Sequence, residues 1–479
     1  MPFVECSREK EWMFPPTLRE LVPQKHEVQF VAHFVECLNL RELGIDPDPA
    51  IEGRPSFPPR VLLACWLYGF MTRVRSTRRL EQACRERLPF MWLTGMTCPD
   101  HNTLWKFYKA NRKAMKKLFK KSVLVAIKLE MVGLVEHALD GSKILASAAK
   151  DRTFDKKGLL ELDRKIQEQI DDLERQNKDE EGRHSERSGE LPAKLRKAGA
   201  LKTQVSEAMQ ALEGSAKEKV NLTDGDARFM KTTSGLRVAY NGQAVVEGKS
   251  GIIVAEEVVD EPGDNDELLP MLHKVEENLG ANAEHNLADA GYFSGENLTQ
   301  CAKEGLEVVM PEPQAKRKKD SPEQAYHKSK FEYNREQDIY RCPQGEILTL
   351  SHTGRDRDVE AWTYRGRGCK GCAVREQCTK DSKGRTLKRY SYDELVVAHR
   401  QKMKEEPSRS LSKRRKEIVE PVFGIIKEQL EGRRFLLRGL ENVRGEWALL
   451  CAAYNLRKIF KRCWAHDEGP RLRVVLSTA

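Results

Sequence analysis

The chain has 479 residues and a formal net charge of +10, from 83 Lys and Arg against 73 Asp and Glu. This length allows roughly two to four domains with hydrophobic cores, and the positive charge favours a polyanionic partner, although a basic surface also serves solubility. No apolar run reaches the roughly 18 residues that span a bilayer, and residues 1–10 lack a secretory hydrophobic stretch. We therefore expect a cytoplasmic protein, not a membrane protein, whose twelve cysteines are reduced thiols or metal ligands.

Residues 1–130 show no strand alternation and predict several short helices. Basic side chains recur along two of them, at Arg73, Arg75, Arg78, Arg79, Lys106, Lys109, Arg112, Lys113, Lys116 and Lys117. This pattern is typical of a helical DNA-binding domain, in which we expect Arg78, Arg79 and Lys106 to contact DNA. A plain helical domain with charged outer faces is the alternative.

Two apolar segments each lead to an aspartate. Residues 133–139 predict a strand that ends at Asp140, in a tight turn with Gly141, and residues 284–288 predict a strand that ends at Asp289. Carboxylates placed on rigid elements can bind hard cations through oxygen. The alternative for each aspartate is an ordinary turn residue.

The segments around these aspartates predict an alternating order of strands and helices. We expect strands at 236–246 and 251–259 joined as a hairpin, a helix at 266–279, a helix from about Gly295 and a strand at 306–311. This order suits a mixed sheet flanked by helices, and therefore an α/β fold.

Residues 412–430 predict a helix with a buried face. Its apolar side chains recur at helical spacing, at Val419, Val422, Phe423, Ile426 and Leu430. At about 100° per residue, Glu420 lies close to Lys427 and Lys416, which indicates either a solvated ion-pair face or a carboxylate held for a metal. Pro421 requires that the helix start or kink near Glu420.

Three motifs around these carboxylates resemble the acidic motifs of bacterial insertion-sequence DDE transposases. They are Leu139–Lys143, Leu287–Tyr292 and Val419–Gly424 followed by Lys427. The resemblance implies an RNase H-like catalytic domain that cleaves and transfers DNA strands at transposon ends. It also implies that Asp140, Asp289 and Glu420 hold Mg²⁺ or Mn²⁺, which would activate the attacking oxygen and stabilise the leaving one.

The third motif departs from the family pattern in two positions. Lys427 matches the family's Lys after the Glu, but Lys413 and Lys416 stand where related elements often place Tyr and Arg. We expect Lys427, Lys416 and Arg415 to contact DNA phosphates. Glu417 is the nearest rival of Glu420 as the third metal ligand. The family resemblance implies transposon ends and target DNA as partners. It also implies a bacterial cytoplasmic protein that is associated with the nucleoid when bound to DNA. Pairing of the two transposon ends implies at least a dimer.

Two segments interrupt the expected catalytic core. In residues 158–220, two runs of apolar residues at helical spacing predict a coiled-coil hairpin that serves either as an oligomerisation arm or as a DNA-contacting finger. The second segment contains four cysteines, Cys342, Cys369, Cys372 and Cys378. Their spacing is typical of a structural Zn²⁺ site; the alternatives are unbound thiols or an eroded site.

These expectations define a domain organisation. We expect a DNA-binding domain at 1–130, a catalytic core at 131–157 and 221–313, the hairpin at 158–220, a zinc-binding insertion at 314–390, completing helices at 391–465 and a tail at 466–479. Two other functions remain open, a DNA-binding protein without catalysis and a metal-dependent nuclease that cleaves without joining.

Overall fold

The structure is a computed structural model of the whole chain. It describes residues 17–48, 55–181, 190–214, 218–313, 325–356 and 359–464, together with Met13 and Val475, so the expected tail lies almost wholly outside the described residues. The chain forms two compact units. The first contains residues 1–264, 270–284 and 416–479, and the second contains residues 265–269 and 285–415.

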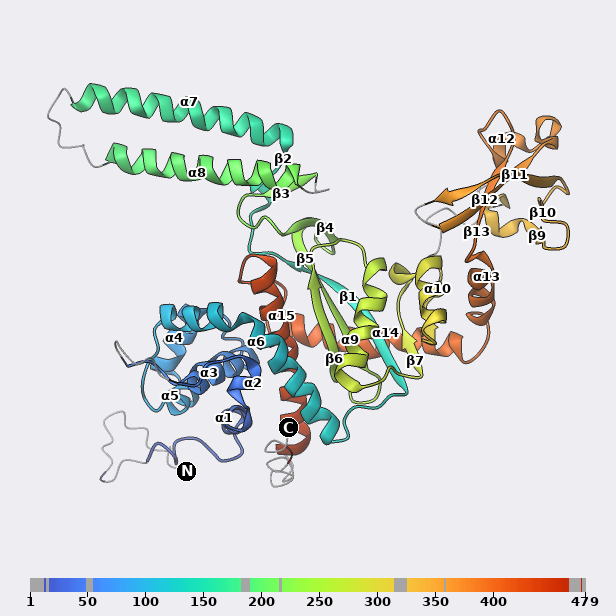
Figure 1. Cartoon of the computed structure of the whole chain (residues 1–479). Coiled ribbons are helices and arrows are strands. Elements are labelled where there is room, and N and C mark those ends of the chain that lie inside the picture. Colours follow the sequence, from blue (N-terminus) through green and yellow to red (C-terminus); the bar gives the residue numbers. More distant parts are fainter. Residues whose placement is uncertain are drawn as a thin grey trace, which may run out of the picture. The chain divides into compact units, whose positions relative to one another are not determined.

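The N-terminal part of the first unit is helical, as predicted (Figure 1). Its helices are α1 (Glu27–Cys37), α2 (Leu40–Leu43), α3 (Pro59–Met71), α4 (Thr77–Glu86), α5 (Leu88–Leu93) and α6 (His101–Lys128). The apolar α3 is almost wholly buried, and its Trp66 indole donates to the carbonyl of Leu104 at 3.1 Å. Asp100 caps α6 by accepting from the amide of Thr103 at 2.6 Å.

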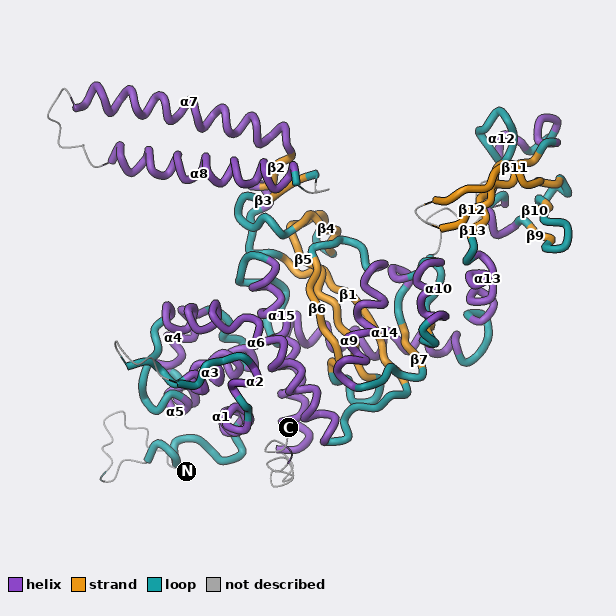
Figure 2. The backbone as a smooth tube through the Cα atoms, in the orientation of Figure 1, coloured by secondary structure: helices purple, strands orange, loops and turns teal. Residues whose placement is uncertain are grey.

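The antiparallel sheet of the first unit is built around one long strand. Strand β5 (Gly235–Glu247) pairs along one edge with β1 (Glu136–Leu145), and along the other edge with β6 (Ile253–Val259) and β4 (Arg228–Thr232). The predicted hairpin corresponds to β5 and β6, whereas β4 was not predicted. Figure 2 shows β1, β5 and β6 side by side.

Helices complete this unit. They are α9 (Leu268–Leu279), most of whose residues belong here, the end of α14 (Ser408–Gly424) and α15 (Leu440–Ile459). The buried α15 packs against β6, where the Asn455 side chain accepts from the amide of Ile253 and donates to its carbonyl, both at 2.9 Å. Because this side chain satisfies the backbone of a buried strand, it fixes the helix against the sheet.

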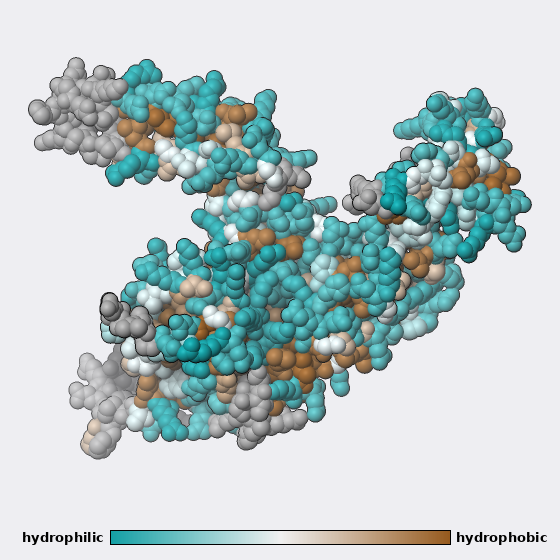
Figure 3. Space-filling view, viewed as in Figure 1, coloured by the Kyte–Doolittle hydropathy of each residue, from teal (hydrophilic) through white to brown (hydrophobic). Residues whose placement is uncertain are grey.

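Two long helices, α7 (Lys156–Glu181) and α8 (Glu190–Glu213), follow β1 and run side by side (Figure 1). Leu159, Ile166 and Val205 lie in the apolar cluster between them, and Figure 3 shows hydrophobic surface between the two helices and hydrophilic surface around it. The short strands β2 (Thr153–Asp155) and β3 (Lys219–Asn221) pair at their base.

The second unit contains a parallel pair of strands and a separate antiparallel sheet. The parallel pair is β7 (His285–Leu287) and β8 (Val308–Val309), connected through α10 (Gly295–Lys303). The antiparallel sheet has the order β13-β12-β11-β10-β9. Its strands are β9 (Glu332–Asn334), β10 (Ile339–Arg341), β11 (Ile347–Asp356), β12 (Val359–Gly366) and β13 (Thr386–Tyr390), and the helices α12 (Arg375–Cys378) and α13 (Asp393–Lys402) accompany it.

Parallel and antiparallel strands with flanking helices confirm the predicted α/β class. Within the described ranges, no helix combines the length and the apolar character that crossing a membrane requires.

Candidate active site

Asp140 lies inside strand β1, not at its end. Strand β1 continues for five residues beyond it and pairs with β5 without interruption from His137 to Leu145. The predicted tight turn at Asp140 and Gly141 is therefore wrong, because the ladder to β5 outweighs the local turn preference of this dipeptide. The half-buried Asp140 carboxylate accepts from the amide of Gly141 at 2.9 Å.

Glu420 lies on α14, whose predicted apolar stripe is buried as expected. The helix begins at Ser408 and continues through Pro421 to Gly424. It therefore does not start near Glu420, and a kink there, the other expectation, stays a prediction. The Glu420 side chain is exposed, and neither Lys416 nor Lys427 forms an ion pair with it anywhere in the described ranges. The ion-pair interpretation of this face therefore does not hold for Glu420.

Lys427 follows α14 in a π-helical turn, Ile425–Gln429, and is half-buried. Burial and the nearby Arg433 lower the pKa of Lys427, whereas the carboxylate of Asp140 acts in the opposite direction. The segment after this turn lies alongside β1, since the amide of Leu145 donates to the carbonyl of Arg433 at 3.1 Å. The structure thus brings Lys427 and Asp140 into one electrostatic environment.

A polar cluster that the sequence did not suggest lies at Gly141. One carboxylate oxygen of Asp264 accepts from Asn241 at 2.7 Å, from Gln243 at 2.8 Å and from Lys143 at 2.9 Å. A Cβ at Gly141 would lie 2.6 Å from this oxygen. Because Gly141 has no side chain, the polar cluster around Asp264 packs directly against the backbone of Gly141, the residue after Asp140 on β1. The acidic segment 264–267 is the one sequence signal that could have pointed to it.

Asp289 belongs to the second unit and follows β7 by two residues, close to where the sequence placed it. Its carboxylate accepts from the amide of Gly291 at 2.7 Å and caps a short 3₁₀ helix, Ala290–Tyr292. This contact is typical of an ordinary turn residue, which was the alternative interpretation of Asp289. A strand end also leaves the carboxylate exposed on a rigid element, so its grouping with Asp140 and Glu420 stays a prediction.

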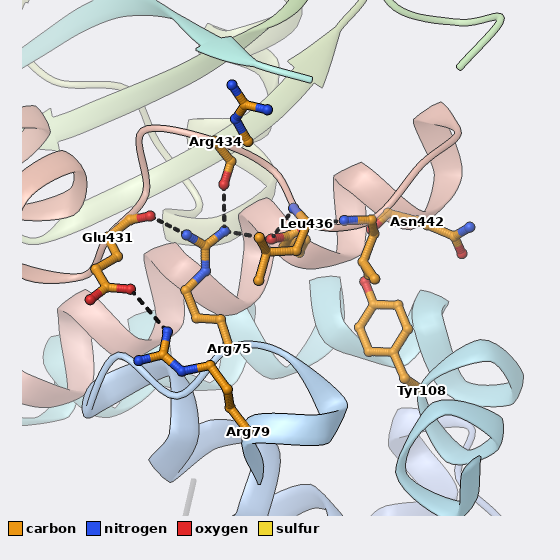
Figure 4. Close-up of polar contacts among 9 residues, drawn as sticks. Arg75, Arg79, Tyr108, Glu431, Arg434, Leu436 and Asn442 are labelled. Atoms are coloured by element: carbon orange, nitrogen blue, oxygen red, sulfur yellow. Dashed lines mark hydrogen bonds and ion pairs between the residues drawn. The ribbon is translucent and has the colours of Figure 1, made fainter. Parts of the chain in front are cut away.

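A buried ion pair ties the N-terminal helices to the segment after Lys427 (Figure 4). The Arg75 guanidinium pairs with Glu446 of α15 and donates to the carbonyls of Glu431 and Arg434. The Glu446 carboxylate in turn accepts from the amide of Leu436 at 3.0 Å. Arg75 is therefore a structural residue and is not on the basic surface that the sequence suggested.

The predicted DNA contacts have different surroundings. Arg78, Lys106 and Lys416 are exposed, Arg415 is 8% exposed, and the exposed Arg79 pairs with Glu431 at 3.5 Å. A groove of about 750 Å³ runs along α6, and its lysines are Lys106, Lys109, Lys113 and Lys117. Cations that line a groove on an exposed helix suit a polyanion.

Helix α6 bends within this groove. Asn111 has non-helical dihedral angles, φ −112° and ψ 17°, and its side chain donates to the carbonyl of Phe107 at 2.9 Å. Because an asparagine that bonds back to the preceding turn competes with the helical ladder, this contact accounts for the bend.

The four predicted zinc ligands lie around one small cavity of the second unit. Cys342, Cys369, Cys372 and Cys378 line a space of about 20 Å³, enough for a single water or ion. Burial raises the pKa of the Cys378 thiol, and the other three thiols raise it further, while Arg385 lowers it. The four thiols line one cavity, but no three His, Cys, Asp or Glu side chains of the described ranges stand together as metal ligands. Zinc binding at these cysteines therefore stays a prediction.

Two comparisons with protein families define the class of this chain. Residues 341–460 match the model described as Transposase DDE domain, and residues 16–110 match the model described as Transposase domain (DUF772). The chain thus carries two transposase domains, and its resemblance to insertion-sequence DDE transposases is confirmed. The first match includes Glu420, Lys427 and the four cysteines, and neither match includes Asp140 or Asp289. Comparisons with curated proteins and with solved structures gave no match.

Proposed function

We propose that this transposase cleaves DNA at the ends of an insertion sequence and joins those ends to target DNA. The observation that carries the proposal is the match of residues 341–460, which include Glu420 and Lys427, to the transposase DDE domain. The carboxylate of Asp140 also acts on the pKa of Lys427. A cation beside a carboxylate suits phosphodiester chemistry, because phosphate binding and metal binding have to occur together.

In this proposal Asp140, Asp289 and Glu420 are the metal ligands, and Lys427 contacts the scissile phosphate. Carboxylate oxygens are the ligands that Mg²⁺ prefers, and Glu420 is exposed and unpaired among the described residues. A bound Mg²⁺ would supply Lewis-acid stabilisation of the leaving oxygen and activation of the attacking one. Lys427 is half-buried, and solvent screens a half-buried charge less than an exposed one, which favours its contact with a phosphate.

We further propose an RNase H-like core. Support comes from the antiparallel strands β1, β5 and β6, and from the parallel β7–α10–β8 unit that follows them. The proposed ligands lie on the first strand, after β7 and on α14, all in or beside regular elements.

Residues 1–130 are the proposed DNA-binding domain, and the groove along α6 is its phosphate-binding surface. Lys106, Lys109 and Lys113 are exposed and form no ion pairs within the described residues. The match to the transposase domain at 16–110 supports a role for this region in transposition. The four cysteines are the proposed zinc ligands, and paired ends call for at least a dimer.

The test uses the full chain, Mg²⁺ and DNA that carries the two ends of its element. We expect cleaved and joined products with the wild type, and at least a hundredfold less of both with Asp140→Asn, Asp289→Asn or Glu420→Gln, since each removes one ligand charge. Glu417→Gln is the matched control, because Glu417 is likewise exposed on α14 one turn before Glu420, and we expect it to retain activity.

The products also separate the alternatives. Cleavage without joining identifies a nuclease. DNA binding without cleavage, and without Mg²⁺ binding in a calorimetric titration, identifies an inactive DNA-binding protein. Full activity of Asp140→Asn and Asp289→Asn contradicts the assignment of the metal ligands.

A further inference from the structure

Two helix ends meet in the first unit, where the N-terminal helices contact the turn that carries Lys427. One is the end of α3, which Arg73 follows by two residues, and the other is the π-helical turn Ile425–Gln429 after α14. The Nε of Arg73 donates to the carbonyl of Gln429 at 2.7 Å. Arg73 therefore contacts the turn of Lys427 directly, although Arg73 and Gln429 are 356 positions apart in the sequence.

The backbone at both helix ends is left-handed at a charged residue. Arg73 has a φ of 68°, and Glu431 has a φ of 55°. Glycine adopts this conformation at helix ends without a steric penalty, whereas a residue with a Cβ is strained there. The strain at Arg73 therefore points to a role of its side chain that glycine could not fill.

The Arg73 side chain supplies a donor where the helix lacks one. The last carbonyls of a helix have no amide partner within it, and a cation near them also interacts favourably with the helix dipole. The neighbouring Arg75 donates to the carbonyls of Glu431 and Arg434 (Figure 4). Arg79 pairs with the Glu431 side chain at 3.5 Å. The segment from Arg73 to Arg79 thus holds the end of the π-helical turn at several points.

The π-helical turn determines the direction of the Lys427 side chain. The amide of Leu430 donates to the carbonyl of Ile425 at 3.0 Å, which defines the wide turn. Lys427 is half-buried within it, with its ammonium 6.0 Å from the centroid of the Phe423 ring. Such turns are rare and occur often at functional sites. Because a return to α-helical geometry would change the direction of Lys427, contacts that hold the turn also hold the lysine.

We propose that Arg73 is a positioning residue for Lys427, which it keeps directed at the scissile phosphate by holding the end of the π-helical turn. This inference rests on the proposed function, in which Lys427 contacts that phosphate. It adds a role in the reaction for the loop between α3 and α4, which lies in the N-terminal helical region.

Arg73→Gly is the main test variant, because it removes the side chain and also relieves the left-handed strain. We expect stability that is unchanged or higher, but cleavage of end DNA that is roughly ten- to a hundredfold slower at saturating DNA, the cost of a small misplacement of a catalytic group. The DNA concentration that gives half the maximal rate should stay the same, since Arg73 acts through Lys427 and not on DNA.

Met96→Gly is the matched control. Met96 also has a left-handed backbone, with a φ of 64°, and its side chain is 58% exposed. The substitution therefore has the same effect on the backbone as Arg73→Gly, and we expect it to leave the cleavage rate unchanged.

Two further variants connect the effect to Lys427. Arg73→Lys keeps a cationic donor, so it should retain most of the cleavage rate that Arg73→Gly loses. In a Lys427→Ala background, Arg73→Gly should cause no further loss, because two residues that act as one unit are not additive. A double variant that is slower than Lys427→Ala by the full factor of Arg73→Gly would overturn the proposal.

Hydrogen exchange of the free full chain tests the same contact without catalysis. We expect the amides of residues 425–434 to exchange roughly tenfold faster in Arg73→Gly than in the wild type or in Met96→Gly, because the turn opens more often without its donor.

The outcomes separate this inference from the proposed function. A wild-type cleavage rate or unchanged exchange of residues 425–434 in Arg73→Gly overturns the positioning role and leaves the transposase proposal intact. An unchanged maximal rate that requires more DNA assigns Arg73 to DNA binding, which also overturns that role. A wild type that does not cleave contradicts the proposed function itself, and the exchange measurement still decides whether Arg73 holds the turn.

Discussion

The guanidinium of Arg75 and the carboxylate of Glu446 form an ion pair in the interior of the first unit, where their side chains are 3% and 1% exposed. This ion pair joins three segments, namely the loop before α4, the segment 431–437 and helix α15 (Figure 4). The segment 431–437 also pairs with the end of β1. The strand that carries Asp140 and the N-terminal helices therefore share one buried point of attachment.

Removal of one partner of this pair should strongly destabilise the first unit. We expect Glu446→Ala to lower the free energy of unfolding by roughly 3–5 kcal/mol, since it leaves the Arg75 charge buried and the amides of Leu436 and Leu437 without their acceptor. Denaturant unfolding measures the change. Arg79→Ala is the control, because its pair with Glu431 is exposed, and it should cost less than about 1 kcal/mol. Equal effects of the two variants would contradict this account.

Gly141→Ala should disturb the strand that carries Asp140. The added Cβ would lie 2.4 Å from the Gln243 amide nitrogen and 2.6 Å from the Asp264 carboxylate, so we expect a loss of about 1–3 kcal/mol of stability from overpacking and a large loss of cleavage. Gly199→Ala is the matched control, because nothing lies within 4 Å of its Cβ in helix α8. It should stabilise the helix by up to about 1 kcal/mol. Unchanged stability of Gly141→Ala would show that the cluster at Asp264 is loosely packed.

Two adjacent glutamates on β6, Glu256 and Glu257, should make the free energy of unfolding depend on pH in opposite directions. Burial, with Glu257 next to it, raises the pKa of Glu256 to about 7. Burial would also raise the pKa of Glu257, but Lys274 and Lys116 outweigh it and lower the pKa to about 2. Between pH 4.5 and 7 the folded state holds a proton on Glu256 that the unfolded state has lost, so this residue makes stability fall as pH rises, by roughly 3 kcal/mol in total.

Glu256→Gln should remove that dependence and make the protein more stable than the wild type above pH 7. The stability that Glu257 contributes is present above pH 4.5 and is lost as pH falls towards 2. Glu257→Gln should therefore destabilise the protein at neutral pH, since it leaves Lys116 and Lys274 without their partner. Urea midpoints measured from pH 4 to pH 8 test both variants. Parallel pH profiles for Glu256→Gln and the wild type would contradict the expected role of Glu256.

The cysteine cluster predicts zinc in the purified protein. We expect about one zinc ion per chain by elemental analysis, and we expect a strong chelator or Cys372→Ser to remove it and to lower the thermal stability of the β9–β13 sheet domain. Cys98→Ser is the control, because Cys98 is a half-buried thiol that belongs to the first unit and not to the cysteine cluster of the second. Zinc-free wild type with unchanged stability in chelator would identify the four thiols as unbound.

Local patterns in the sequence predicted the N-terminal helices, the β5–β6 hairpin and the buried stripe of α14, but not β4 or the strands β9–β13. Contacts between distant segments limited the prediction of the site. The stripe from Val419 to Leu430 repeats at the helical period, so its burial could be read from the sequence alone. The turn at Asp140 was expected from the dipeptide Asp140–Gly141, whereas the ladder from β1 to β5 depends on residues about a hundred positions later. The contact of Asp264 with Lys143 depends on the same ladder, because it places Lys143 of β1 opposite Asn241 of β5.

The surroundings of Lys427 show the same limit. Helical geometry alone places Lys427 near Glu420. In the fold, however, the charges that shift the pKa of Lys427 are those of Arg433, Asp140 and Glu428, and two of these lie outside its own helical turn. The cleft lined by Tyr333, Tyr340, Tyr390 and Tyr392 could not be predicted either, because these rings come from β9, β10, β13 and the residue before α13, which meet only in the folded domain.

The paired strands β2 and β3 have a consequence for how the α7–α8 hairpin is inserted into the chain. They hold the two ends of the α7–α8 hairpin together, with Asp155 opposite Lys219, so the whole hairpin leaves and re-enters the fold at one place. A short turn between these two residues could replace it without moving β1 or β5. The α7–α8 hairpin can therefore be deleted or replaced as one unit, because both of its ends meet at the β2–β3 pair.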